Sequence, residues 1–277
     1  MKGYYIYLFI CGFTLLSCNK EAEIDSDIYE PKVVIEGSIE NGSYASVQLS
    51  ISAPLSDSLT LLNYVIRSAK VTVSDSEQSE VLSLQTTNKI NPFEYVGSSI
   101  IGKPGKQYHL KVEYRNKTIT AQTEIPEPVV LDSIWFKKEP GNDSVTYIHV
   151  KFNNSSNHFY QIATRQENQG AYIPCLYGNI DPSLYGKGQG ISMQINKGPV
   201  IFPKTDYRTY FVSPSDVEIR FSTQTKESYE FWTSYENEVL NAQNPIFPAN
   251  SSLKSNIKGG IGIWAGYGTF YYKINLK

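Results

Sequence analysis

Cysteine is the residue type in this sequence with the clearest chemical use, because a thiol can react as a nucleophile, pair with a second thiol or bind a metal. The 277-residue chain has three cysteines, Cys11, Cys18 and Cys175. Cys11 lies inside an apolar run, residues 4–16, and Cys18 stands where that run gives way to a polar, acidic stretch. The position of Cys18 at this break predicts that its thiol is a site of modification.

The first residues have the features of an export signal. Lys2 carries the only charge before the acidic stretch, and the apolar run of 13 residues is shorter than the roughly 20 needed to span a bilayer. The tetrapeptide Leu15–Cys18 resembles the lipobox of bacterial lipoproteins, although Leu16 replaces the commoner small residue. This resemblance implies that residues 1–17 are a signal peptide and that Cys18 is lipidated. The alternative is an ordinary secretory signal with an incidental cysteine.

An acidic tether is predicted after the lipidated cysteine. Residues 19–30 hold five acids and one lysine without hydrophobic periodicity, so we expect residues 18–30 to be a solvated tether. The pair Lys20 and Glu21 resembles the signal that places lipoproteins of Bacteroidetes on the outer face of the outer membrane. The resemblance implies a lipid-anchored protein exposed at the cell surface.

No metal, cofactor or catalytic site is expected from the sequence. Once the signal is removed and the lipidated thiol is occupied, Cys175 is the only free thiol, which leaves no disulfide and no zinc site built from cysteines. His109, His149 and His158 follow no metal-ligand spacing. The usual hydrolase and nucleotide-binding motifs are also missing from the sequence. A pair of glycosidase carboxylates is the one arrangement that sequence spacing cannot exclude.

A glycine cluster near the C-terminus fits a dinucleotide-binding pattern only formally. Gly260, Gly262 and Ala265 have the required spacing, but none of the 12 residues that follow is acidic and no helix is predicted there. The cluster therefore predicts glycine-rich strands that pack closely against a neighbour.

The elements that must position any site are mostly strands. The 21 tyrosines favour strands, and from Pro31 onward apolar and polar residues alternate. Alternation and turn residues predict an antiparallel β-sandwich of immunoglobulin-like or transthyretin-like type over residues 31–126. Pro126 and Pro128 mark a domain boundary. The alternating segments are 31–40, 44–51, 69–75, 107–114 and 117–123.

A second β-rich domain is predicted over residues 129–277. Its only helical pattern predicts a helix near 226–242, with Thr225 as the N-cap and Asn244-Pro245 after its end. The predicted strands are 129–139, 144–153, 158–166 and two final strands around 257–264 and 269–276.

The least regular segment, residues 167–190, is predicted to be a long loop. Loops of this length in a compact domain are usually functional or disordered. Its tyrosines, Tyr172, Tyr177 and Tyr185, are candidate contacts for a ligand or a partner, because tyrosine combines a large contact area with a polar tip. The alternative is an insertion that folds back on its own sheet.

Three Asp-Ser-apolar tripeptides resemble the acceptor for periplasmic O-glycosylation in Bacteroidetes. They make Ser58, Ser133 and Ser144 candidate glycosylation sites.

A nucleic-acid partner is not expected, because the net charge is only -2 and the 25 basic residues form no block.

The C-terminal half resembles a known family. The segments ESYEFWTSYENE and NPIFPANSSLKSNIKGGIGIWAGYGTFYY, with the early VVIEGSIENG and AKVTVSD, are similar to Bacteroidetes lipoproteins grouped as domain of unknown function 4249. The chain departs from the family in having Trp264 where phenylalanine or another aromatic is usual. The family resemblance carries over no catalytic or ligand residues.

The resemblance implies a non-enzymatic surface lipoprotein that is accessory to a TonB-dependent receptor in binding or admitting a nutrient. The ligand, whether small molecule, glycan or peptide, is left open. The two alternatives are a surface hydrolase for glycan or peptide, and an adhesin or structural surface module.

Overall fold

The structure is a computed structural model. By its contacts the chain divides into residues 1–30 and residues 31–277, and the second unit is the subject here. The predicted signal peptide, Cys18 and nearly all of the tether lie outside the described residues, as do Ser58 and His158. The described residues are 30–53, 61–86, 92–154, 159–166, 170–198, 207–241 and 253–277.

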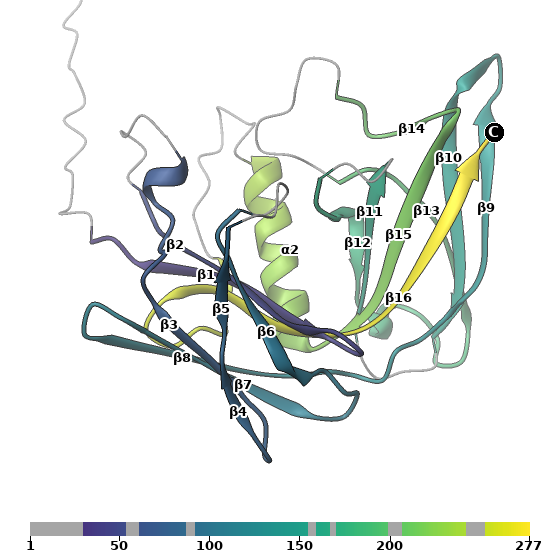
Figure 1. The fold of residues 1–277 in the computed structure, drawn as a ribbon. Helices are drawn as coiled ribbons and strands as arrows, with labels where there is room; N and C mark the ends of the chain where they lie inside the picture. Colours follow the sequence, from purple (N-terminus) through teal and green to yellow (C-terminus); the bar gives the residue numbers. More distant parts are fainter. Residues whose placement is uncertain are drawn as a thin grey trace, which may run out of the picture. The chain divides into compact units, whose positions relative to one another are not determined.

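The described residues form sixteen strands and one α-helix, which confirms the predicted all-β class (Figure 1). Eight strands make one large sheet. In the order of the sheet they are β12 (Ile173–Ile180), β11 (Phe159–Gln166), β15 (Ser215–Gln224), β16 (Ile261–Leu276), β1 (Val33–Glu40), β2 (Tyr44–Ile51), β6 (Glu94–Ile101) and β5 (Ser83–Gln85).

Two four-stranded sheets accompany the large sheet, and we call them the first and second cover sheets. The first cover sheet contains β4 (Ser79–Val81), β3 (Lys70–Ser74), β7 (Gln107–Tyr114) and β8 (Lys117–Glu124). The second contains β13 (Gly190–Ile195), β10 (Asn142–Asn153), β14 (Phe211–Val212) and β9 (Leu131–Glu139).

Each cover sheet encloses a hydrophobic core against the large sheet. In the first core Ile35 and Val47 of the large sheet pack with Leu110 of the cover sheet, and in the second Phe221 packs with Phe152. The alternation of apolar and polar residues explains both sandwiches, because every second side chain of a strand reaches the core. The cores divide near the predicted boundary at residues 126–129, while the large sheet continues across it.

The link between the two halves is the parallel pairing of β1 with β16. The register runs from Val34 opposite Ile261 to Glu40 opposite Tyr267. Figure 1 shows β16, in yellow, running from the side of β1 and β8 to the side of β15. The first and last strands of the fold are therefore neighbours at the centre of the large sheet.

Gly262 and Ala265 of the glycine cluster lie in one continuous strand, β16, which Gly260 precedes, so the prediction of two final strands is wrong. The chain stays extended through β16 because its glycines admit a crossing segment instead of making a turn. A Cβ on Gly266 would lie 2.1 Å from the Glu124 carbonyl oxygen, and one on Gly268 would lie 2.2 Å from that of Pro126. The end of β8 thus passes directly over β16, and the predicted close packing of the cluster is confirmed.

Helix α2 (Lys226–Asn241) forms where the helical pattern predicts it. The hydroxyl of Thr225 accepts a hydrogen bond from the backbone N–H of Ser228 at 3.4 Å, which is the geometry of an N-cap. Phe231 of the helix packs on Ile263 and Tyr267 of β16. These two residues alternate with Trp264 of the first core, so α2 covers the face of the large sheet that points away from both cores.

The prediction of a long loop at residues 167–190 is wrong, because this segment contains the strand β12 and a short 3-10 helix, η3 (Pro182–Leu184). Alternation is lost in β12 because its pairing with β11 shifts register between Gln161 and Ala163, and because Tyr177 has a positive φ of 57°. A second 3-10 helix, η2 (Leu61–Asn63), precedes β3.

A search for membrane spans among the described helices found none of sufficient length and apolarity.

Candidate functional site

Polar side chains of several strands meet on the face of the large sheet that carries α2. Pairing across β1, β2 and β6 puts Glu36 opposite Gln48, and Gln48 opposite Glu94. A pocket of about 330 Å³ opens on this face, and we call it the charged pocket. Its lining includes Glu36, Ser46, Gln48, Glu94, Arg165, Tyr172, Arg220, Trp232 and Tyr267.

Arg220 is the most buried cation of the charged pocket, with 15% of its side chain exposed. Its guanidinium donates to Oε1 of Gln161 at 2.8 Å and to Oε1 of Glu40 at 3.4 Å. The hydroxyl of Tyr271 donates to the other oxygen of Glu40. The Nε of Arg220 is buried and has no hydrogen-bond partner. Arg220 is therefore neutralised by Glu40 but keeps donor capacity of its own.

Arg165 has a carboxylate partner of its own on the neighbouring strand. Its guanidinium donates to Oε2 of Glu218 at 2.5 Å, and the Tyr172 hydroxyl donates to the same oxygen at 2.6 Å. The Tyr172 hydrogen bond, followed by that of Arg165, lowers the pKa of Glu218. Burial and then the bond to Glu218 raise the pKa of Tyr172 to about 12. Tyr172 thus stays protonated and fixes the rim of the pocket.

Glu36 and Glu94 differ from Glu40 and Glu218 because no described basic side chain pairs with them. Among the described residues neither forms an ion pair, and the bonding partner of Glu94 is the hydroxyl of Ser46. Glu36 is an exposed residue that lines the lumen of the pocket. Desolvation of its carboxyl by nearby protein atoms raises the pKa of Glu36, the charge of Arg220 opposes the rise, and the charge of Glu94 adds to it.

An aromatic wall from α2 and β16 closes one side of the charged pocket. The indole N–H of Trp232 donates to the hydroxyl of Tyr267 at 2.6 Å. The Ser228 hydroxyl donates to Oε1 of Gln224 at 2.7 Å and also to the Tyr267 hydroxyl at 3.4 Å. These bonds hold the Tyr267 ring in place, with the Arg220 guanidinium 5.1 Å from its centroid.

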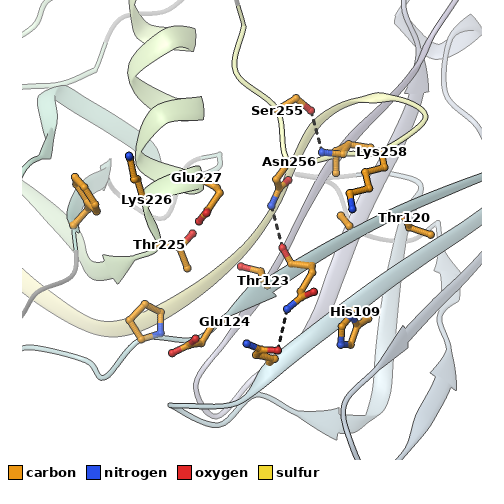
Figure 2. Close-up of a pocket in the computed structure, with 16 residues that line it drawn as sticks. His109, Thr120, Thr123, Glu124, Thr225, Lys226, Glu227, Ser255, Asn256 and Lys258 are labelled. Atoms are coloured by element: carbon orange, nitrogen blue, oxygen red, sulfur yellow. Dashed lines mark hydrogen bonds between the residues drawn. The ribbon is translucent and has the colours of Figure 1, made fainter.

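A second, larger cavity of about 840 Å³ lies beside the first cover sheet, and we call it the polar cleft. Figure 2 shows His109 and Thr120 of the cover sheet, Asn256 of the segment before β16, and Thr225 at the start of α2 around it. Its amides mostly bond within the protein, as in the 2.9 Å bond from Gln122 to Gln107.

The charged pocket is the better candidate site, although the polar cleft is larger. The charges at the cleft belong to surface side chains, such as Lys226 with 68% of its side chain exposed. In the charged pocket, by contrast, only 15% of the Arg220 side chain is exposed, and the Glu36 pKa is raised. Burying such groups costs folding free energy, and shifted carboxyl pKa values are typical of functional sites.

The structure places the three predicted tyrosines apart. Tyr172 lines the charged pocket and packs on Tyr271, with ring centroids 5.5 Å apart. Tyr177 is 70% exposed, and its backbone N–H donates to Glu236 of α2 at 2.8 Å. Tyr185 follows η3 and is 41% exposed. Only Tyr172 belongs to the candidate site.

Two of the candidate glycosylation serines are exposed. Ser133 lies in β9 and Ser144 in β10, and both residues face solvent. Exposure is compatible with glycosylation of these two hydroxyls, which stays a prediction.

The remaining reactive side chains do not join the charged pocket. Burial raises the pKa of the Cys175 thiol to about 12, so this thiol is unreactive at neutral pH. His109 lines the polar cleft, and His149 stacks on Trp135 with ring centroids 5.3 Å apart. Within the described part of the chain, no cluster of three His, Cys, Asp or Glu side chains could hold a metal ion.

Four charged residues of the pocket, Glu36, Glu94, Arg165 and Arg220, are not among the sequence-predicted site residues. Glu36 and Arg220 occupy polar positions of alternating strands, which in a sequence indicate a solvated face. Arg165 follows a run of buried residues in β11 and has no such pattern around it. One sequence signal could have indicated that this face is covered. The polar face of the strand SDVEIRFSTQ ends in the uncharged residues Ser222 and Gln224, which the structure buries.

The fold and the pocket define an all-β protein that carries a charged, ligand-sized pocket on the outer face of a central sheet. The model of the family described as domain of unknown function DUF4249 matches residues 19–271, so the chain belongs to this family. Comparison with curated proteins gave no match.

Among solved structures the chain is similar to a segment of two fibronectin type-III domains from chicken tenascin. The alignment covers 89% of this chain and 99% of that chain, at 8% identity and a TM-score of 0.25. A TM-score this low carries no argument about fold or function.

Proposed function

We propose that this protein is a non-enzymatic, lipid-anchored protein of the bacterial outer-membrane surface that binds a nutrient for a TonB-dependent transporter. The observation that carries the binding role is the charged pocket, in which two carboxylates lack a basic partner and one of them has a raised pKa. Groups held in an unfavourable environment are usually retained for a ligand. A flat surface would instead favour the adhesin or structural module.

The membrane location in this proposal rests on Leu15–Cys18 and on the acidic tether. Several acyl chains on one cysteine give a stable anchor, at about 0.8 kcal/mol per buried CH₂. The transporter partner rests on the family resemblance to Bacteroidetes lipoproteins.

The variant Cys18→Ser is expected to lose the lipid anchor. Without the thiol no diacylglycerol can be attached, so labelled fatty acid should not be incorporated and the protein should leave the membrane fraction. The measurement is radiolabelling with palmitate, followed by fractionation of cells. Cys11→Ala is the matched control, because it changes a cysteine of the removed peptide and should keep the label. Full labelling of Cys18→Ser would contradict the anchor.

Co-purification tests the transporter role. The tagged full chain is solubilised with detergent from outer membranes of its own cells, and bound proteins are identified by mass spectrometry. We expect a TonB-dependent β-barrel to be recovered with the wild-type chain. Recovery of no β-barrel from wild-type membranes would overturn this role.

A surface hydrolase is the second candidate, because Glu36 and Glu94 share one pocket. A carboxyl with a raised pKa can act as a general acid beside an ionised one, which typically contributes about 10²–10⁴-fold to a rate. Release of sugars or peptides from surface polymers by the wild-type chain, lost in Glu36→Gln, would favour this candidate over the binding role.

A further inference from the structure

The charges around the charged pocket do not balance. Arg165 is paired with Glu218, and Arg220 is paired with Glu40, so each cation already has an anion. Glu36 and Glu94 remain, and no described basic side chain forms an ion pair with either. The pocket therefore has an excess of negative charge at the end where β1, β2 and β6 meet.

We propose that the charged pocket binds its ligand through a cationic amine or guanidinium group, held between the carboxylates of Glu36 and Glu94. This inference rests on the proposed binding function and names the chemical class of the ligand. Two carboxylates in a partly desolvated pocket attract a cation more strongly than they would in water.

The neighbouring residues suit an organic cation. Gln48 lies between the two carboxylates in the sheet, and its side-chain oxygen can accept a further N–H. Trp232 lines the same pocket and can offer the π-face of its indole to a cation. The donor set does not suit a metal, because the described His, Cys, Asp and Glu side chains supply no group of three.

The two arginines of the pocket do not compete for the carboxylates. Arg165 is held by Glu218 and Arg220 by Glu40. Their Nε groups have no partner but are buried, so a ligand in the lumen does not reach them. The ligand class is therefore a molecule that the pocket recognises through an amine or guanidinium group.

The raised pKa of Glu36 gives a second readout. The folded chain favours the protonated carboxyl of Glu36. At a pH above the usual pKa of a glutamate, Glu36 therefore lowers the free energy of unfolding, and this cost fades as the pH falls through the raised pKa. Glu36→Gln is therefore expected to be folded and slightly more stable than wild type at neutral pH, with a higher Tm. A measured Tm at or above the wild-type value would show that a loss of binding in this variant does not come from unfolding.

The probe for the test is 1,4-diaminobutane, with succinate as the anionic counterpart of the same length. Binding to the purified chain lacking its signal peptide is measured by calorimetry at neutral pH and low salt. We expect the diamine to bind and succinate not to bind. Glu36→Gln and Glu94→Gln should each weaken diamine binding about tenfold, which is about 1.4 kcal/mol, because each variant removes one charged acceptor of the cation.

The matched control is Glu124→Gln, which removes a carboxyl from the lining of the polar cleft. It should bind the diamine as wild type does. Diamine binding unchanged in both pocket variants, no diamine binding to wild type, or tighter binding of succinate would each overturn the proposal. If Glu36→Gln still recovers the β-barrel partner but diamine binding fails, this inference is wrong and the transporter role stands. If the wild-type chain recovers no β-barrel, the transporter role is wrong.

Lowering the pH should weaken diamine binding, because protonation of Glu36 removes one of the two charges. The groups that face Glu36 are Glu94 of β6, Arg220 of β15 and Tyr235 of α2. The arginine and the tyrosine keep their charge state between neutral and mildly acidic pH. The same pH change should have a smaller effect in Glu36→Gln, and equal loss in both chains would contradict the role of Glu36.

Discussion

Replacing Arg220 with methionine is expected to lower the free energy of unfolding by about 3–5 kcal/mol, the usual cost of removing one partner of a buried ion pair. The guanidinium joins β11 to β1 through Gln161 and Glu40, and only 15% of its side chain is exposed. In the variant the buried Glu40 carboxylate keeps only the Tyr271 hydroxyl as a partner. Urea denaturation followed by tryptophan fluorescence measures the change.

The control for this prediction is Lys111→Met, which removes a cation from an exposed ion pair with Glu113 on the first cover sheet. Exposed pairs contribute little, so this variant should unfold near the wild-type midpoint. The double variant Arg220→Met with Glu40→Gln should regain part of the lost stability, because the unpaired charge is gone. A midpoint for Arg220→Met equal to that of the control would show that the buried pair does not stabilise the sheet.

Truncating Trp264 to alanine is expected to cost about 3–5 kcal/mol of unfolding free energy, as for other large-to-small changes in a core. Trp264 is fully buried in the first core, and its indole N–H donates to the Tyr108 carbonyl at 3.1 Å. Gly37 leaves the space for the ring, since a Cβ there would lie 2.9 Å from it. The variant loses packing and also leaves a buried carbonyl without its donor. Thermal unfolding by circular dichroism measures the effect.

Trp135→Ala is the matched control for the core tryptophan. Trp135 lies in β9, is only partly buried and stacks on His149. Its loss should shift the Tm less than the loss of Trp264, because a half-exposed ring leaves no enclosed cavity. Equal shifts for the two variants would contradict the assignment of Trp264 to the first core.

Much of the fold follows from local patterns in the sequence. Alternation at residues such as Val33 and Ile35 predicts half-buried strands, and those residues lie in the first core. The helical pattern and the Thr225 cap predict α2, which begins at Lys226. These patterns succeed because the period of the side chains is set by the backbone of each element.

The strands β16 and β12 could not be predicted from local sequence patterns, because neighbouring segments determine their conformation. The glycines of β16 look like a break between two strands, and only the crossing of Glu124 and Pro126 explains them as a point of contact. In β12 the register shift and the positive φ of Tyr177 remove the alternation by which a strand is recognised.

The candidate site was predictable only in part. Tyr172 was predicted as a contact and lines the charged pocket, whereas Tyr177 and Tyr185 lie elsewhere. Glu36 and Arg220 were not predicted, because a charged residue at every second position of a strand is the normal sign of solvent. Their place in one pocket depends on α2 and on the segment at Tyr172, which contribute Trp232 and Tyr172 to the same lining.

The sequence by itself determined the kind of elements, the half of each strand that is apolar, and the position of Cys18 at the break after the apolar run. The tertiary structure alone decided that β1 and β16 are partners, and that charged residues separated by 184 positions, Glu36 and Arg220, line one pocket. The physical reason is that periodicity is a property of one segment, whereas a site depends on which segments become neighbours. The register of β1, β2 and β6 brings Glu36 and Glu94 to one face of the sheet, and α2 adds Trp232 to the same pocket.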